Sequence, residues 1–155
     1  MSYKFGFHLK LCGIVSQLTP PGTPQCNGVS KRRNHTLLDM VRYMMSLADL
    51  PLSFWGYALK TAAFTLNRAP SKSVETTPYE LWFSKNPKLS FLKVWGCDAY
   101  VKKFRPDKLK PKSEKCIFIG YPKVTVGYTF YHRFEGKTFV AENGSFWRRS
   151  FSRKK

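Results

Sequence analysis

The sequence predicts an α+β chain in which a mainly helical first part is followed by a small β-barrel. Apolar residues recur at helical spacing between residues 30 and 68, and short β-rich runs separated by turns follow Phe91. Apolar residues make up 43% of the chain and aromatic residues 16%, which is sufficient for a compact fold. The 155 residues suffice for one ordinary domain or two small ones and exclude a large multidomain enzyme.

The first part contains one predicted strand, over residues 10–18, which are partly β-branched and end at a proline-rich turn. A helix follows, with Ser30 as its N-cap and its end before Pro51. One face of this helix carries the apolar residues Leu37, Val41, Met44, Met45 and Ala48.

Two further helices are expected, over residues 53–68 and in a short segment after Pro78. Thr77 and Pro78 are typical of an N-cap followed by proline in the first helical position. The aromatic residues of these segments are expected in the core, and they include Trp55, Tyr57, Tyr79 and Trp82.

The second part contains five predicted strands, over residues 94–97, 99–104, 115–121, 127–133 and 137–141. Residues 84–91 are the expected linker. The predicted domain order is therefore a helical part over 1–83, the linker, a small barrel over 92–147 and a basic tail over 148–155.

Positive charge dominates the chain, with 27 Lys and Arg against 9 Asp and Glu and a net charge of +18. A field of this size favours a polyanionic partner, and nucleic acid is the leading candidate. The cations concentrate in three clusters and a solvated surface is the competing explanation for each. The clusters consist of Lys31, Arg32 and Arg33; Lys102, Lys103, Arg105, Lys108, Lys110, Lys112 and Lys115; and Arg148, Arg149, Arg153, Lys154 and Lys155.

The chemistry of known catalytic and metal sites is sparse in the sequence. The nine acidic residues form no paired motif, and no glycine-rich phosphate loop occurs. Cys12, Cys26, Cys97 and Cys116 are widely spaced, which indicates neither a zinc module nor a disulfide framework, and we expect them to be small apolar residues. Tyr128, Phe130 and Tyr131 are candidates for stacking on bases, although strand alternation directs about half of such residues into the core.

Neither a secretory leader nor a membrane-spanning helix is predicted. The N-terminal residues lack an apolar stretch followed by a cleavage site, and the most apolar stretch, 47–66, is interrupted by Asp49, Pro51 and Lys60. We therefore expect a soluble, intracellular protein without a membrane partner. Its location is not encoded, although the basic clusters are compatible with nuclear import.

Long runs of the sequence resemble the integrase region of copia-type retrotransposon Pol polyproteins. The runs are GIVSQLTPPGTPQCNGVSKRRNHTLLDMVRYMM, LPLSFWGYALKTAAFTLNRAP and TPYELWFSKNPKLSFLKVWGCDAYV, followed by KCIFIGY at 115–121. The resemblance implies that residues 1–83 are part of a ribonuclease H-like catalytic core and that residues 92–147 form an SH3-like barrel.

The resemblance also implies a lost active site. Integrases of this family hold two Mg²⁺ or Mn²⁺ ions with two aspartates and a glutamate; the aspartates belong to segments absent from this chain. The glutamate position follows Asn27-Gly28-Val29-Ser30 and is occupied by Lys31. A lysine ammonium donates no lone pair and repels a cation, by about 4 kcal/mol per unit charge at about 4 Å. We expect no catalysis and no cofactor.

Two functions remain open after these observations. The first is a catalytically inactive integrase fragment that binds nucleic acid, DNA in particular, without sequence preference. The alternative is a domesticated interaction module, in which an exposed helical face formed by Leu37, Val41 and Met44 docks on a partner, on a second copy or on an intact integrase.

Overall fold

The computed structural model describes residues 3–15, 20–70, 75–103, 108–109 and 111–147. The chain divides into two compact units, residues 1–36 and residues 37–155. This division differs from the predicted boundary at 84–91, because the helices after residue 37 belong to the same unit as the sheet. The predicted basic tail, 148–155, lies outside the described residues.

The first unit begins with a helix, α1 (Tyr3–Leu11), which ends inside the predicted strand over residues 10–18. Gly13, with a φ of 67°, closes this helix: the N–H groups of Gly13 and Ile14 donate to the carbonyls of Lys10 and Leu9. The predicted strand is therefore wrong for residues 10–15, and residues 16–18 lie outside the described part. Gly13 acts as a helix stop, a role that the strand interpretation overlooked.

Helix α2 (Gly28–Leu47) starts earlier than predicted. A 3-10 turn over Pro24–Asn27 leads directly into it, and the Gly28 N–H donates to the Gln25 carbonyl. Ser30 therefore lies inside the helix and is not its N-cap. The predicted end before Pro51 is confirmed.

In the second unit, the last three turns of α2 and helix α3 (Trp55–Leu66) enclose a small apolar core. Its buried members are Val41, Ala48, Ala58, Ala62 and Trp95. Leu37 and Met44 pack against it, so the helical face expected to be exposed is covered by the chain itself. The structural premise of the alternative docking function is therefore wrong.

Helix α4 (Pro78–Phe83) has the predicted start. The Thr77 hydroxyl accepts the Glu80 N–H at 3.2 Å, and the Thr77 N–H donates to the Glu80 carboxylate at 2.6 Å, which completes a capping box. The prediction that Trp55 and Trp82 belong to the core is wrong, since they are 58% and 83% exposed. Tyr79 is half-buried, because its ring packs on Phe83 and under the Arg68 guanidinium.

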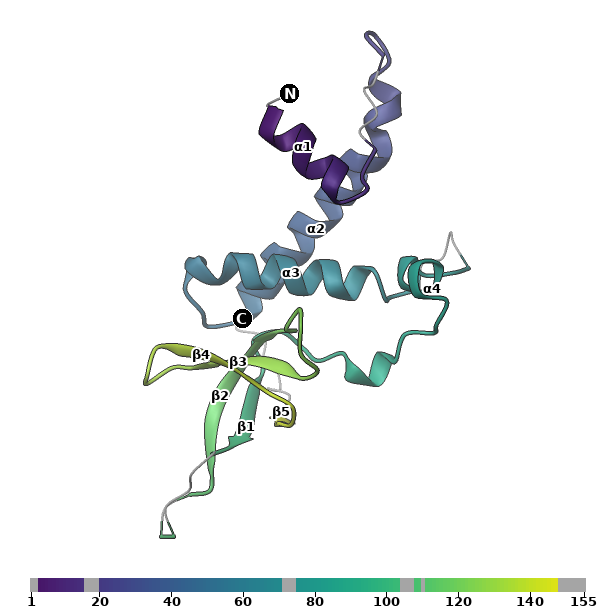
Figure 1. Ribbon diagram of the computed structural model, residues 1–155. Coiled ribbons are helices and arrows are strands. Elements are labelled where there is room, and N and C mark those ends of the chain that lie inside the picture. The colour runs from purple at the N-terminus through teal and green to yellow at the C-terminus, as the bar shows by residue number, and fades with distance from the viewer. Residues whose placement is uncertain (1–2, 16–19, 71–74, 104–107, 110, 148–155) are drawn as a thin grey trace. The chain divides into compact units, whose positions relative to one another are not determined.

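Five antiparallel strands form one sheet in the order β4-β3-β2-β1-β5 (Figure 1). The strands are β1 (Asp98–Lys102), β2 (Ser113–Gly120), β3 (Tyr128–His132), β4 (Lys137–Ala141) and β5 (Ser145–Trp147). Four of the five predicted strands correspond to β1–β4. The predicted α+β class is therefore confirmed, whereas the ribonuclease H-like origin of the helices stays a prediction.

The predicted strand over residues 94–97 is a turn. Gly96 adopts a φ of 76°, and the Cys97 N–H donates to the Val94 carbonyl across it, as in a type II turn. In its place the sheet gains β5, which pairs with β1 and was not predicted. Three residues are too few to show a strand period in the sequence.

The core of the sheet lies on the face that carries Ala99, Cys116 and Phe118. Phe118 and Phe130 are fully buried there, and rings of Phe139 and Phe146 cover them. Ile117 and Ile119 of β2 are also buried but lie outside this cluster, on the strand that α3 contacts. A central strand buried on both faces explains the continuous apolar run of β2.

Candidate nucleic-acid interface

The hairpin between β1 and β2 carries all five described cations of the predicted loop cluster. Lys102 ends β1, Lys115 lies in β2, and the connection between the strands holds Lys103, Lys108 and Lys112. We call these five residues the hairpin cations. All except Lys103 are exposed. Arg105, Lys110, Arg148 and Arg149 lie outside the described residues.

Two of the hairpin cations form ion pairs within the sheet. Lys115 Nζ lies 3.1 Å from Asp98 Oδ2, and Lys103 Nζ lies 4.0 Å from Glu114 Oε2. Both lysine side chains are partly exposed, and such pairs contribute only about 0–1 kcal/mol. A phosphate can therefore compete for these ammonium groups.

The remaining predicted cations, Lys31, Arg32 and Arg33, are exposed on α2 in the first unit. Because α2 begins at Gly28, they are the fourth to sixth residues of the helix. The helix dipole acts mainly over the first turn, so it destabilises these charges little.

The face of the sheet opposite the aromatic core, called the outer face here, carries two aromatic rings next to Lys102 and Lys115. Asp98, Tyr100 and Lys102 point to this face, since Ala99 and Val101 between them are buried. Register pairs Tyr100 with Ser145 on β5 and with Lys115 on β2, and it pairs Asp98 with Trp147. Tyr100 and Trp147 are therefore diagonal neighbours on one face. With Asp98, Lys115 and Ser145 they line an open hollow of about 570 Å³.

The aromatic residues predicted for stacking have another role. Phe130 is fully buried, Tyr128 is 8% exposed, and Tyr131 packs on Phe54 with ring centroids 4.6 Å apart. Tyr128 and Phe130 belong to the core on the inner face of β3, whereas Tyr131 points to the opposite face, where it is paired with Ile117. The sequence analysis did not identify Tyr100 or Trp147. Tyr100 could have been found, because it alternates with Lys102 along a predicted strand. Trp147 could not, because its position depends on the pairing of β5 with β1.

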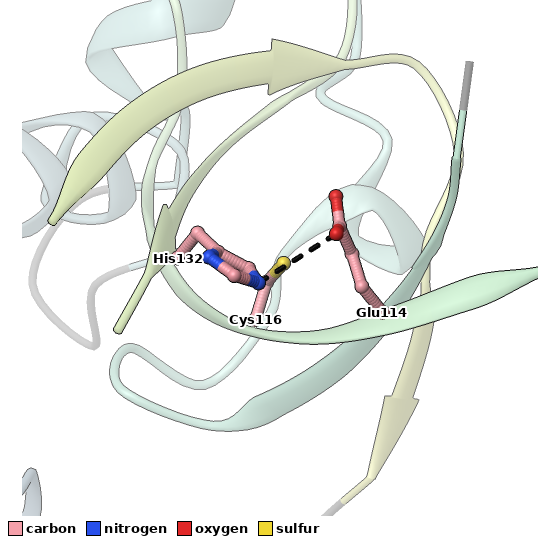
Figure 2. A group of neighbouring side chains, drawn as sticks. All are labelled: Glu114, Cys116 and His132. Carbon is pink, nitrogen blue, oxygen red and sulfur yellow. Dashed lines mark ion pairs between the residues drawn. The ribbon is translucent and has the colours of Figure 1, made fainter. Parts of the chain in front are cut away.

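A second polar group lies on the inner face of the sheet, where register places His132 directly opposite Cys116 (Figure 2). The Glu114 Oε2 lies 3.6 Å from His132 Nε2, and the two form an ion pair when the imidazole is protonated. The three potential ligand atoms lie within 4.8 Å of one another. The wide spacing of these residues in the sequence concealed this grouping.

The hydrogen bonds around His132 oppose metal binding by this group. The Glu135 N–H donates to Nδ1 at 3.2 Å, so a neutral ring carries its proton on Nε2, which faces Glu114. A metal at Nε2 would require the proton to move to Nδ1, against that N–H donor. Burial, followed by the charges of Glu114 and Glu135, raises the pKa of the Cys116 thiol to about 11, which further disfavours the thiolate that a metal needs.

The cysteines partly follow the prediction of small apolar residues. Cys97 and Cys116 are free and buried in the core of the sheet. Cys12 is free and exposed, contrary to that prediction, because it lies just after the end of α1. Its thiol lies 3.7 Å from His8 Nε2. The side chain of Cys26 lies outside the described part.

None of the helices in the described residues is long and apolar enough to span a membrane.

Comparison with known proteins relates this architecture to retroelements. Residues 97–155 match the family described as the retroviral polymerase SH3-like domain. The chain is 46% identical over 119 residues to the retrovirus-related Pol polyprotein from transposon TNT 1-94 of Nicotiana tabacum, a match that covers 75% of this chain. It is 31% identical over 147 residues, or 93% of this chain, to the corresponding polyprotein from transposon RE2 of Arabidopsis thaliana.

These matches span only 9% and 10% of the two polyproteins. The match to an uncharacterised mitochondrial protein of Arabidopsis thaliana covers a larger share of the relative. The two are 36% identical over 83 residues, which are 53% of this chain and 68% of that protein. The family match at residues 97–155 includes all five strands of the sheet. The chain therefore belongs to the copia-type retrotransposon Pol polyproteins, of which it represents a segment of the integrase region.

Proposed function

We propose that this chain is a non-catalytic, retroelement-derived module that binds nucleic acid through electrostatic contacts of the sheet. The observation that carries the proposal is the gathering of the hairpin cations, four of them exposed, on one hairpin of a chain with a net charge of +18. Lysine ammonium groups on such a hairpin can reach phosphates without reading base edges. Sequence preference should accordingly be small.

Absence of catalysis is part of the proposal. Its support is Lys31, which occupies the position that the family's metal-binding glutamate should hold and lies exposed on α2. An ammonium group there cannot hold a divalent cation. Residues 1–83 would then be the remnant of a ribonuclease H-like core, of which α3 is retained for its packing on β2.

The test is a titration of the full chain with unrelated DNA duplexes of equal length at several salt concentrations. If about five phosphates are neutralised, the slope of log K against log salt should be about −4 to −5. Replacing Lys108 and Lys112 by Ser should weaken binding to every duplex alike and make the slope shallower by about two units.

A matched control replaces Lys85 and Lys88, two exposed lysines before the sheet, by Ser. It removes the same charge from another surface and should leave most of the affinity. Binding that does not depend on salt, or equal losses in the two double variants, would refute the hairpin as the site. Binding to one duplex alone would refute the lack of sequence preference.

A further inference from the structure

The outer face of β1 and β5 carries two exposed aromatic side chains, Tyr100 and Trp147, that are not part of the core of the sheet. Tyr100 is 42% exposed and Trp147 is 65% exposed. Both rings line the open hollow of about 570 Å³ and lie on adjacent strands as diagonal neighbours. Large aromatic side chains that remain this exposed on one sheet face can provide contact area for a ligand.

The surroundings of the two rings are cationic. Lys115 lies directly across from Tyr100 on β2, and Lys102 follows two residues later on the same face of β1. A neighbouring hollow of about 340 Å³ shares Tyr100 and Ser145 and adds Lys93 and Lys102 to its lining. Rings flanked by ammonium groups match a ligand that alternates flat apolar groups with phosphates.

We propose that Tyr100 and Trp147 form a stacking platform for the unpaired bases of single-stranded nucleic acid, whose phosphates contact Lys102 and Lys115. The proposal rests on the proposed nucleic-acid binding and names the form of ligand that this surface prefers. A duplex buries the faces of its bases in its own stack, whereas every unpaired base offers a face to an exposed ring. The platform therefore adds affinity for single strands, and the hairpin cations serve both forms.

The aromatic contribution can be separated from the ionic one by salt. Stacking releases no counterions, so Trp147→Ala should lower log K for a single strand by the same amount at each salt concentration, with an unchanged slope. Lys102→Ser should make the slope shallower by about one unit. One stacked base is expected to account for an affinity loss of about 5- to 150-fold on removal of its ring.

The experiment measures binding of the full chain to a labelled oligothymidine and to a duplex of the same length. Tyr100→Ala and Trp147→Ala should each weaken oligothymidine binding by that factor and duplex binding by clearly less. Trp82→Ala is the matched control, because Trp82 is a tryptophan on α4, outside the sheet, and is more exposed than Trp147, at 83% against 65%. It should change neither affinity.

Two aromatic replacements guard against loss of fold. Trp147→Phe and Tyr100→Phe keep a ring and should retain most of the affinity for oligothymidine. Oligothymidine should also quench tryptophan fluorescence in the wild type, and Trp147→Phe should lose that quenching while Trp82→Phe keeps it.

The outcomes distinguish this inference from the function on which it rests. Salt-dependent duplex binding together with unchanged oligothymidine binding by Trp147→Ala would overturn the platform alone. Equal losses on both ligands would likewise overturn it, because a ring that serves both forms does not select unpaired bases. Absence of binding to either ligand by the wild type would overturn both proposals.

Discussion

Trp95 donates its indole N–H to the carbonyl of Ile119 at a distance of 2.8 Å, and this bond joins the helical core to the sheet. The Thr61 hydroxyl of α3 lies 3.3 Å from the same oxygen. The single Thr61 proton is shared with the Tyr57 carbonyl, 2.9 Å from the hydroxyl, so the buried Ile119 carbonyl has one full donor in Trp95 and a second within reach in Thr61. Because Trp95 itself is buried among Val41, Ala48, Ala58 and Ala62, the bond also fixes how the helices sit on β2.

This shared carbonyl predicts a non-additive loss of stability. Trp95→Phe should reduce the free energy of unfolding by about 1–3 kcal/mol, through the lost hydrogen bond and the smaller ring. Combined with Thr61→Val, the loss should exceed the sum of the single losses, since only the double variant leaves the Ile119 oxygen without either donor. Urea unfolding of the four proteins measures the difference, and Trp82→Ala, at an exposed site, should cost less than about 0.5 kcal/mol. Additive losses would contradict the shared role.

A second prediction concerns Gly96, where a left-handed φ coincides with a close neighbour. A Cβ at this position would collide with the Cβ of Ala48. Gly136 has a similar φ of 65° and open space around it. Thermal unfolding should therefore show a larger loss of stability for Gly96→Ala than for Gly136→Ala, by about 1–3 kcal/mol, the usual cost of overpacking. Equal losses would mean that backbone strain alone makes the glycine necessary.

The buried thiols predict a loss of stability in alkali. Burial, aided by Asp98, raises the pKa of Cys97 from 9.0 to about 11, and the pKa of Cys116 is raised to the same value. Between pH 9 and 11 the unfolded chain releases thiol protons that the folded chain keeps, so the free energy of unfolding falls as the pH rises through this window.

Urea unfolding on either side of that window measures this effect. The double variant Cys97→Ala/Cys116→Ala is less stable at neutral pH but should show a weaker decline in alkali, because the two titrating groups are gone. The decline that remains then reports Tyr121 and Tyr128, because burial raises the pKa of both phenols as well. An identical decline in the two proteins would contradict the buried protonated thiols.

A fourth prediction addresses catalysis. The purified chain, incubated with labelled DNA that carries element ends and with Mg²⁺ or Mn²⁺, should give neither end processing nor strand transfer. Lys31→Glu should not create activity, since a single carboxylate cannot position two metal ions. The readout is product formation on a denaturing gel. Metal-dependent cleavage that persists through repurification of the chain would refute the proposed absence of catalysis.

Local signals in the sequence were sufficient for the second unit's helices and most of its strands. Thr77, Pro78 and Glu80 specify the start of α4 through side chains and backbone groups within four residues of one another. The same reasoning failed at Gly13 and Gly96, which both have a positive φ. The sequence shows a glycine in each case, and it does not show whether that glycine ends a helix or makes a turn.

Features that depend on strand pairing could not be predicted. Tyr100 and Trp147 are far apart in the sequence and become neighbours only through the pairing of β1 with β5. Glu114, Cys116 and His132 meet in the same way through β2 and β3. A shift of register by one residue would send each of these side chains to the other face, so periodicity alone cannot place them.

The burial of β2 on both faces limits the width of the proposed platform. Helix α3 contacts β2, where Ile117 and Ile119 are buried, so a nucleic acid bound at the proposed platform would lie on β1, β5 and the Lys115 end of β2. Strands lie about 4.8 Å apart, so this strip is about 10 Å across. A footprint this small accommodates only a few nucleotides per protein molecule. Long strands would consequently bind many copies side by side, and the stoichiometry at saturation would rise in proportion to strand length.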